Sequence, residues 1–162
     1  MMDRMMRREL IKSHEGLRLR KYRCSRGHWT IGWGWNLDAH PLPAEIASFY
    51  RIHGAITEEM AERLLDISMA AAEADCRNIY PGFDQFSERR KDALVDFVFN
   101  LGAAGALKFR RMRAAIIAGD WLEAARQLND SAYWRQLGGD PAGTDDGKLE
   151  RPEELYRMLV EG

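Results

Sequence analysis

Glu15 to Thr30 reads Glu-Gly-Leu-Arg-Leu-Arg-Lys-Tyr-Arg-Cys-Ser-Arg-Gly-His-Trp-Thr, and this stretch marks a change from a helical pattern to a strand pattern. Leu17, Leu19 and Tyr22 punctuate its first half, which predicts one β-strand. Ser25-Arg26-Gly27 has the composition of a turn. The stretch therefore predicts the first strand and the turn of a β-hairpin.

Residues 29–35 supply the second strand of this hairpin. Their order, Trp-Thr-Ile-Gly-Trp-Gly-Trp, alternates side chains across a strand, with glycines where a ligand could approach the backbone. The helix end and the hairpin gather a carboxyl (Glu15), a thiol (Cys24) and a hydroxyl (Thr30) within sixteen residues. Hydrolysis of a glycosidic bond needs a proton donor and a group that acts on water or on the anomeric carbon, and these side chains fit those roles.

The spacing of these three residues resembles the motif of the phage-type lysozymes, glycoside hydrolase family 24. That motif is Glu, eight residues, Asp or Cys, five residues, Thr, and here it is flanked by Glu-Gly-Leu-Arg-Leu and Thr-Ile-Gly-Trp-Gly. The resemblance continues through residues 99–102, 121–125 and 131–136, so it covers most of the chain.

The resemblance implies a muramidase that hydrolyses the β-1,4 bond between N-acetylmuramic acid and N-acetylglucosamine in bacterial peptidoglycan. It implies that Glu15 is the general acid and that Cys24, in the place of Asp, acts with Thr30 on the water or as the nucleophile. Arg151 is implied as the partner of the catalytic Glu15. The residues implied in substrate binding are Asn36, Phe99, Asn100 and Gln127.

The cysteine leaves the mechanism open between inversion and retention of the anomeric centre. An unperturbed thiol titrates near 8.5 and is mostly neutral at pH 7, although Arg23 and Arg26 could lower that value. Two other interpretations remain. One is a catalytically inactive peptidoglycan-binding relative, and the other is a cysteine peptidase or amidase using Cys24 with His28, for which no third orienting residue is evident.

The hairpin pattern followed by five apolar-striped helical segments predicts an α+β fold in two lobes. We expect a single domain, residues 1–162, with a small hairpin lobe at about 15–56 and a linking helix at about 57–79. The helical lobe should comprise about 80–162 together with an N-terminal helix, 4–14. The cleft is expected between the hairpin and the helices of the larger lobe.

Composition indicates a soluble globular protein, with 46% hydrophobic and 30% charged residues among 162. We expect no transmembrane segment, no signal peptide, no stable membrane association and a monomer. The chain should accumulate in the cytoplasm and reach the wall through a separate factor such as a holin.

The two cysteines make no disulfide framework, and Cys76 should be a partly buried helical residue. The four histidines lack zinc spacing, so we assign no metal and no cofactor.

The net charge of −1 is unevenly spread along the chain. Residues 1–30 contain nine basic and three acidic residues, a balance of +6, whereas residues 138–162 contain three basic and seven acidic ones, a balance of −4. Solvated surface explains both, but a basic small lobe could also help to hold an anionic wall polymer. No nucleic-acid-binding motif is present, so nucleic acid is not an expected partner.

Helix boundaries follow from local signals. Gly16 should end the first helix, which places Glu15 at the negative end of the helix dipole, where the carboxylate form is disfavoured. Pro43 should open a short helix that Gly54 stops, and Thr57 should cap the long helix. The apolar stripe expected on the long helix comprises Met60, Leu64, Ile67, Ala71 and Ala74.

The later helices carry the expected core of the large lobe. Ser87 should cap a helix that is apolar nearly all round, with Asn100 as the polar exception. Its apolar residues are Ala93, Leu94, Val95, Phe97, Val98, Phe99 and Leu101. A further helix is marked by Leu107, Met112, Ile116 and Ile117. The next begins at a capping box of Asp120 and Glu123, with Trp121, Leu122, Ala125 and Leu128 as core.

The run from Gly138 to Gly147 is predicted to be a flexible surface loop. Against the family pattern, residues 138–150 look like an insertion of about eleven residues. Pro152 should then start the last helix, which carries Leu155, Met158 and Leu159. An insertion at this place could displace Arg151.

Overall fold

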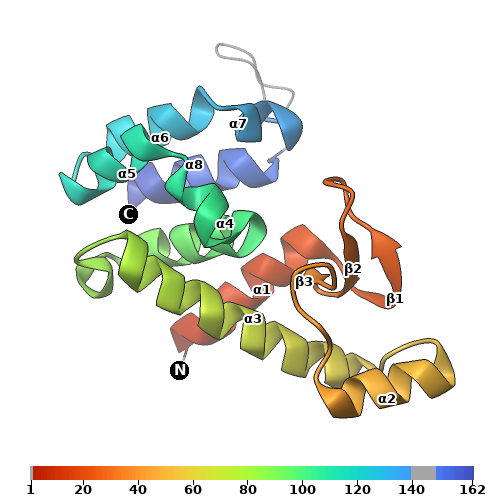
Figure 1. The fold of residues 1–162 in the computed structure, drawn as a ribbon. Helices are drawn as coiled ribbons and strands as arrows, with labels where there is room; N and C mark the ends of the chain where they lie inside the picture. Colours follow the sequence, from red (N-terminus) through yellow and green to blue (C-terminus); the bar gives the residue numbers. More distant parts are fainter. Residues whose placement is uncertain (1, 140–148) are drawn as a thin grey trace. The chain divides into compact units, whose positions relative to one another are not determined.

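The computed structural model of this chain describes residues 2–139 and 149–162 (Figure 1). The chain divides into two compact units, residues 1–71 and 72–162. The N-terminal helix, which the sequence pattern groups with the later helices, belongs to the first unit. The elements in order are α1 (Met2–Glu15), β1 (Arg18–Arg23), β2 (Trp29–Gly32), β3 (Trp35–Asn36), α2 (Ala44–His53), α3 (Glu58–Ile79), η1 (Phe83–Gln85), α4 (Glu88–Leu107), α5 (Arg110–Ile117), α6 (Trp121–Asn129), α7 (Ala132–Gln136) and α8 (Arg151–Glu161). This mostly helical order with one small sheet confirms the predicted α+β class.

The helices of the first unit begin and end where local chemistry predicts. Gly16 has a left-handed φ of 70°, and its amide donates to the Lys12 carbonyl at 3.0 Å, which ends α1 at Glu15. Gly54 ends α2 in the same way, with φ 68°. At the start of α3 the Thr57 hydroxyl accepts from the Met60 amide at 3.1 Å.

The sheet has three strands in the order β1-β2-β3, all antiparallel, and not the two-stranded hairpin that the sequence predicts. Residues 29–35 do not form one strand, because Gly32 and Gly34 have left-handed φ values of 65° and 79° and turn the chain back between β2 and β3. The register between β1 and β2 also shifts between Arg18 and Tyr22. The irregular spacing of Leu19 and Tyr22 in the sequence falls within this shift.

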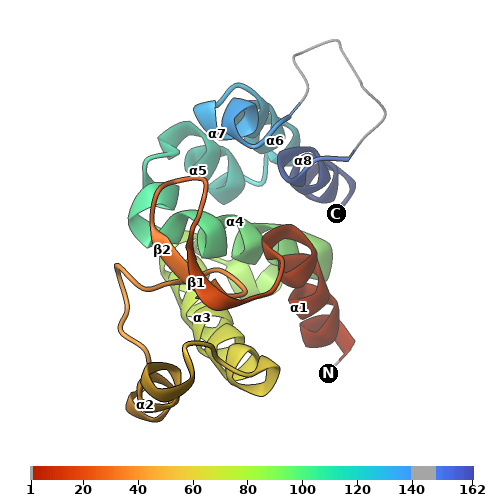
Figure 2. The same cartoon turned by 90° about the vertical axis from the view of Figure 1, so that its right-hand side faces the viewer.

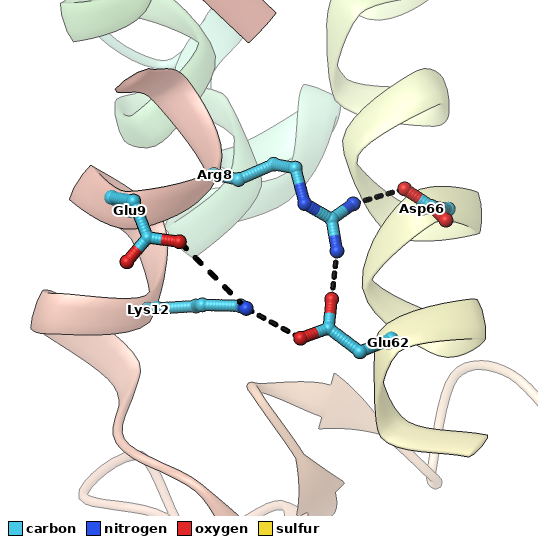
Figure 3. A network of polar contacts seen from close by, with 5 residues as sticks. All are labelled: Arg8, Glu9, Lys12, Glu62 and Asp66. Atoms are coloured by element: carbon cyan, nitrogen blue, oxygen red, sulfur yellow. Dashed lines mark hydrogen bonds and ion pairs between the residues drawn. The ribbon is translucent and has the colours of Figure 1, made fainter. Parts of the chain in front are cut away.

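An ion-pair network joins α1 to α3 within the first unit (Figure 3). Arg8 donates to Glu62 and Asp66, and Lys12 pairs with Glu62 and, at 3.8 Å, with Glu9. The Lys12 ammonium also lies over the Trp33 ring, 4.4 Å from its centroid. Lys12 thus contacts α3 and the turn between β2 and β3 from the last turn of the helix that ends at Glu15.

The buried stripe of α3 differs from the predicted one. Its fully buried side chains are Ala61, Leu64, Leu65, Met69, Ala72, Cys76 and Ile79. Of the predicted stripe only Leu64 is buried, whereas Ile67, Ala71 and Ala74 are exposed. Both stripes have helical spacing, because apolar residues cover adjacent faces of this helix, and packing selects between them. The predicted burial of Cys76 is confirmed, since its exposed fraction is 0%.

In the second unit, α6 packs against both α5 and α8, and α8 packs against α4 (Figure 2). Ser87 caps α4 by accepting from the Arg90 amide at 3.3 Å, and Asp120 caps α6 by accepting from the Glu123 amide at 3.0 Å. The helix from Glu88 to Leu107 is interrupted at Gly102, whose φ of 74° and ψ of 164° are not helical. These caps confirm two predicted helix starts, and the kink is an unpredicted feature.

Two predicted core positions of the second unit are wrong. Trp121 is only partly buried; the Phe86 ring lies edge-on to it with ring centroids 4.8 Å apart, and the Arg90 guanidinium lies over the Trp121 ring, 4.5 Å from its centroid. Leu122 is half exposed. Residues near helix ends can satisfy helical spacing without facing a neighbouring element.

The last helix begins at a capping box in which Glu150 and Glu153 each accept from the other's backbone amide. Its predicted apolar residues, Leu155, Met158 and Leu159, are buried. Gly138 lies beside Glu150, since a Cβ built on this glycine would be 3.7 Å from Glu150 Cγ. Most of the predicted flexible loop, residues 140–148, lies outside the described residues.

Candidate active site

Glu15 is the last residue of α1, immediately before the left-handed Gly16. Its position follows from the glycine, because the chain must leave the helix there to begin β1 at Arg18. The side chain is partly buried. The first unit therefore holds Glu15 three residues before the start of the strand that leads to Cys24.

Cys24 and Thr30 are both hydrogen-bonded to the backbone of one residue, His28. The Cys24 amide and the Thr30 hydroxyl both donate to the His28 carbonyl oxygen, each at 3.0 Å. The predicted turn is confirmed, since the Gly27 amide donates to the Cys24 carbonyl at 2.9 Å and Gly27 has a φ of 81°. Thr30 is buried and Cys24 is partly exposed. The turn thus fixes the hydroxyl and the thiol while leaving the sulfur accessible.

The turn lowers the pKa of the Cys24 thiol. Burial, the largest single influence, raises this pKa, but hydrogen bonds from the Arg26 and His28 backbone, a hydrogen bond with the Thr30 side chain and the Arg26 charge all lower it and together prevail. Arg26 thus acts as predicted. Arg23 instead donates to the Gly27 carbonyl at 2.9 Å and lies over the Trp29 ring. A lowered pKa increases the thiolate fraction at neutral pH.

Tyr22 is a site residue that the sequence pattern does not single out. It pairs with Thr30 across β1 and β2, and it precedes Cys24 by two residues. Burial raises the pKa of the Tyr22 phenol, and the charges of Glu15 and Cys24 raise it further, against a lowering by Arg18. Its phenol therefore stays protonated and is influenced by both the candidate acid and the thiol. The two-residue spacing from Cys24, the period of a strand, is the signal that could have identified it.

The imidazole of His28 lies beside a carboxylate. Its Nδ1 is 3.6 Å from an Asp38 carboxylate oxygen, an orienting partner that the sequence pattern does not show. The influence of His28 on the Cys24 pKa comes from its backbone and not from its ring. A cysteine–histidine pair of the peptidase type needs the ring itself as base, so this geometry does not favour it.

Asn36, predicted to bind substrate, has a structural role in the first unit. Its side-chain oxygen accepts from the amides of Asp38 and Ala39, at 2.9 and 3.2 Å, which closes the turn after β3. It pairs with Thr30 in the sheet, so it lies beside the candidate catalytic residues. Trp33 and Trp35 are each 7% exposed, so both belong to the core.

The other predicted substrate-binding residues lie in the second unit. Phe99 and Asn100 are partly buried and precede the interruption of α4 at Gly102. The Gln127 amide donates to Glu123 one helical turn earlier in α6, at 2.7 Å. Their role in binding stays a prediction.

Arg151 lies at the start of α8, as predicted, and forms a bidentate ion pair with Asp96. The two nitrogen–oxygen distances are 2.9 and 3.1 Å, and the guanidinium also donates to the Asp96 carbonyl at 3.3 Å. The Asp96 side chain is fully buried and that of Arg151 is 10% exposed. Asp96 is therefore a second polar residue among the apolar residues of α4. Asp92, which directly precedes them, is also buried. The pairing of Arg151 with Glu15 stays a prediction.

Across residues 2–139 and 149–162, no three histidine, cysteine or acidic side chains are grouped as a metal site would require. No helix in the same residues has the length and hydrophobicity of a membrane-spanning segment.

Comparison with known proteins identifies the relatives of this chain. The phage lysozyme family model matches residues 12–148. The pre-baseplate central spike protein Gp5 of Enterobacteria phage T4 is 29% identical over 146 residues, which cover 81% of this chain and 25% of the spike protein. An endolysin of Acyrthosiphon pisum secondary endosymbiont phage 1 is 36% identical over 95 residues, 57% of this chain and 55% of the endolysin. A probable T4-type lysozyme 2 of Dictyostelium discoideum is 26% identical over 141 residues, 78% of this chain and 83% of that protein. The chain thus spans about a quarter of the first relative and about half of the second.

Proposed function

This chain belongs to the phage lysozyme family, and from that premise we propose that it is a muramidase acting on bacterial peptidoglycan. Its substrate is the β-1,4 bond between N-acetylmuramic acid and N-acetylglucosamine. One observation best supports this proposal. On the hairpin that follows Glu15, the Cys24 amide and the Thr30 hydroxyl are both hydrogen-bonded to the His28 carbonyl.

In the proposed reaction Glu15 donates its proton to the glycosidic oxygen as the bond to the anomeric carbon breaks. The Cys24 thiolate accepts a proton from water, and the water oxygen bonds to the anomeric carbon. Alternatively the sulfur itself bonds to that carbon, and in a second step water gives a proton to the Glu15 carboxylate as its oxygen bonds to the carbon and the thiolate leaves. The lowered pKa of the Cys24 thiol supports either role, because both need the thiolate.

Thr30 is proposed to orient the water or to stabilise the thiolate. Asn36, Phe99, Asn100 and Gln127 are proposed to bind the sugars, and Arg151 to accompany Glu15, as the family resemblance implies. The protein is proposed to act without a cofactor, as a monomer, and to reach the wall from the cytoplasm through a separate factor such as a holin.

Product analysis on purified peptidoglycan tests this function. Muramidase action releases new reducing sugar ends, whereas a peptidase or amidase would release free amino groups. The wild-type chain should produce reducing ends, and Glu15→Gln should not. Binding to peptidoglycan without either product would instead identify an inactive wall-binding relative.

A further inference from the structure

The β1–β2 hairpin carries a concentrated positive charge, of which the catalytic scheme uses only that of Arg26. No acidic residue occurs between Glu15 and Asp38, and five exposed basic residues lie in that interval. We call them the hairpin cation cluster: Arg18, Arg20, Lys21, Arg23 and Arg26. Because the chain as a whole has a net charge of −1, this positive potential is local to the hairpin.

Neutral groups contact Arg18 and Arg20 of this cluster. The Arg20 guanidinium donates to the Gly54 carbonyl at 3.1 Å, and Arg18 lies 5.4 Å from the centroid of the Tyr22 ring. Carbonyl and aromatic partners position a cation without cancelling its charge. Arg8 and Lys12, in the same unit, are instead paired with carboxylates.

Lys21 and Arg23 form the best-defined part of the cluster. Both lie over the partly buried Trp29 ring, with their charged groups 5.0 and 4.6 Å from its centroid. Within the described part of the chain neither cation forms an ion pair with a carboxylate, and the same is true of Arg18 and Arg20. Two cations held against one aromatic ring are already ordered for an anionic ligand, which lowers the entropic cost of binding it.

The pair lies on the hairpin that carries Cys24 and Thr30, but on its other face. Arg23 pairs with Trp29 and Tyr22 pairs with Thr30, and neighbouring side chains of a strand point to opposite faces of a sheet. An anion bound to Lys21 and Arg23 would therefore belong to a part of the polymer other than the reacting bond. Peptidoglycan itself supplies such anions, because its muramic acid residues carry peptides with free carboxylates.

We propose that Lys21 and Arg23, held on Trp29, bind the carboxylates of the stem peptides of the peptidoglycan strand. This inference rests on the proposed function, whose substrate it specifies further. A nucleic acid is less suited to this site, because proteins that bind its phosphates are usually basic over a whole domain, whereas this chain has a pI of about 6.4.

Pelleting with purified sacculi tests the proposal in the full chain carrying Glu15→Gln, which keeps the polymer intact. The test variant is Lys21→Gln/Arg23→Gln. The matched control is Arg110→Gln/Arg111→Gln, which removes the same charge from two exposed residues of α5. Circular dichroism verifies that each variant is folded. Sacculi freed of protein and phosphate polymers are used untreated and after amidation of their carboxylates.

We expect the test variant to bind untreated sacculi about 2- to 30-fold more weakly at low salt, because exposed ion pairs are individually weak. The control should bind like the parent, and the difference should shrink as salt screens the charges. Amidated sacculi should bind the parent as weakly as untreated sacculi bind the test variant. This last arm needs no substitution in the hairpin, so it remains decisive if the test variant is unfolded.

Binding that survives amidation, or an equal loss in the control, would overturn the proposal. Tighter binding of the parent to single-stranded DNA than to sacculi at the same salt would also overturn it. The outcome is separable from that of the proposed function, because pelleting requires no turnover, and release of reducing ends requires no particular affinity.

Discussion

Cys24 and Thr30 share one hydrogen-bond acceptor, since the amide of the first and the hydroxyl of the second both donate to the His28 carbonyl oxygen at 3.0 Å. A threonine hydroxyl has only one proton to donate. A thiolate at Cys24 would therefore compete with His28 for the Thr30 proton. The hydroxyl is placed to respond to the charge on the sulfur.

Replacing Thr30 should make the thiol harder to ionise. The Thr30 side chain lowers the pKa of the Cys24 thiol, so Thr30→Val should raise that pKa. The rate of alkylation as a function of pH measures this directly, and its midpoint should move to higher pH. Thr30→Ser keeps the hydroxyl and should behave like the wild type. An unchanged midpoint in Thr30→Val would mean that the hydroxyl does not act on the sulfur.

Activity should depend on the ionisation of Cys24. We expect it to rise with pH as the thiol ionises, through a midpoint lower than that of an ordinary thiol, because the pKa of Cys24 is lowered. Alkylation of Cys24 should abolish activity. Cys76 is fully buried, so a Cys76→Ser variant should be inactivated to the same extent.

Substitutions at Cys24 separate a chemical role from a spectator role. Cys24→Asp should stay active, since Asp is the other residue that the family motif allows, and Cys24→Ala should not. The anomeric form of the product then distinguishes the two mechanisms, because inversion indicates activated water and retention indicates attack by sulfur. Full activity of Cys24→Ala would exclude both.

Glu15→Gln should remove activity and leave the free energy of unfolding nearly unchanged. The amide has the same shape but cannot donate an acidic proton to the leaving oxygen, and general acid catalysis typically contributes about 10²–10⁴-fold. Release of reducing ends and urea denaturation measure the two quantities. A folded variant that keeps most of its activity would refute this assignment.

Arg151→Ala should lower activity less than Glu15→Gln does, but it should destabilise the chain by about 3–5 kcal/mol, because it removes the cation of a bidentate ion pair with the fully buried Asp96 carboxylate. Asp96→Asn, which keeps a carbonyl acceptor for the guanidinium, should cost less. Urea denaturation measures both, and a loss below about 1 kcal/mol in Arg151→Ala would contradict the prediction. If Arg151 also pairs with Glu15, the acid limb of the pH–activity profile should shift in the folded variant.

Glu62→Ala should destabilise the first unit by about 1–2 kcal/mol, because Glu62 accepts from both Arg8 and Lys12 in the network that joins α1 to α3 (Figure 3). The loss should diminish at high salt. Asp75→Ala is the control. Asp75 lies on the same helix, α3, and forms no ion pair with any described residue. Equal effects of the two substitutions would mean that the network contributes no stability.

The sequence by itself determined the features that depend on neighbours a few residues apart. Gly16, Thr57, Ser87 and Asp120 set helix boundaries because a cap joins groups within about four residues, and the spacing of Glu15, Cys24 and Thr30 identified the family.

Tertiary structure alone decided which of two apolar stripes of α3 is buried and that Asp96 meets Arg151, 55 residues later in the chain. It also decided that residues 29–35 turn back at Gly32 and Gly34 and that the His28 carbonyl joins Cys24 to Thr30. Burial and long-range pairing depend on which elements the folded chain brings together, and helical or strand spacing is compatible with more than one such arrangement.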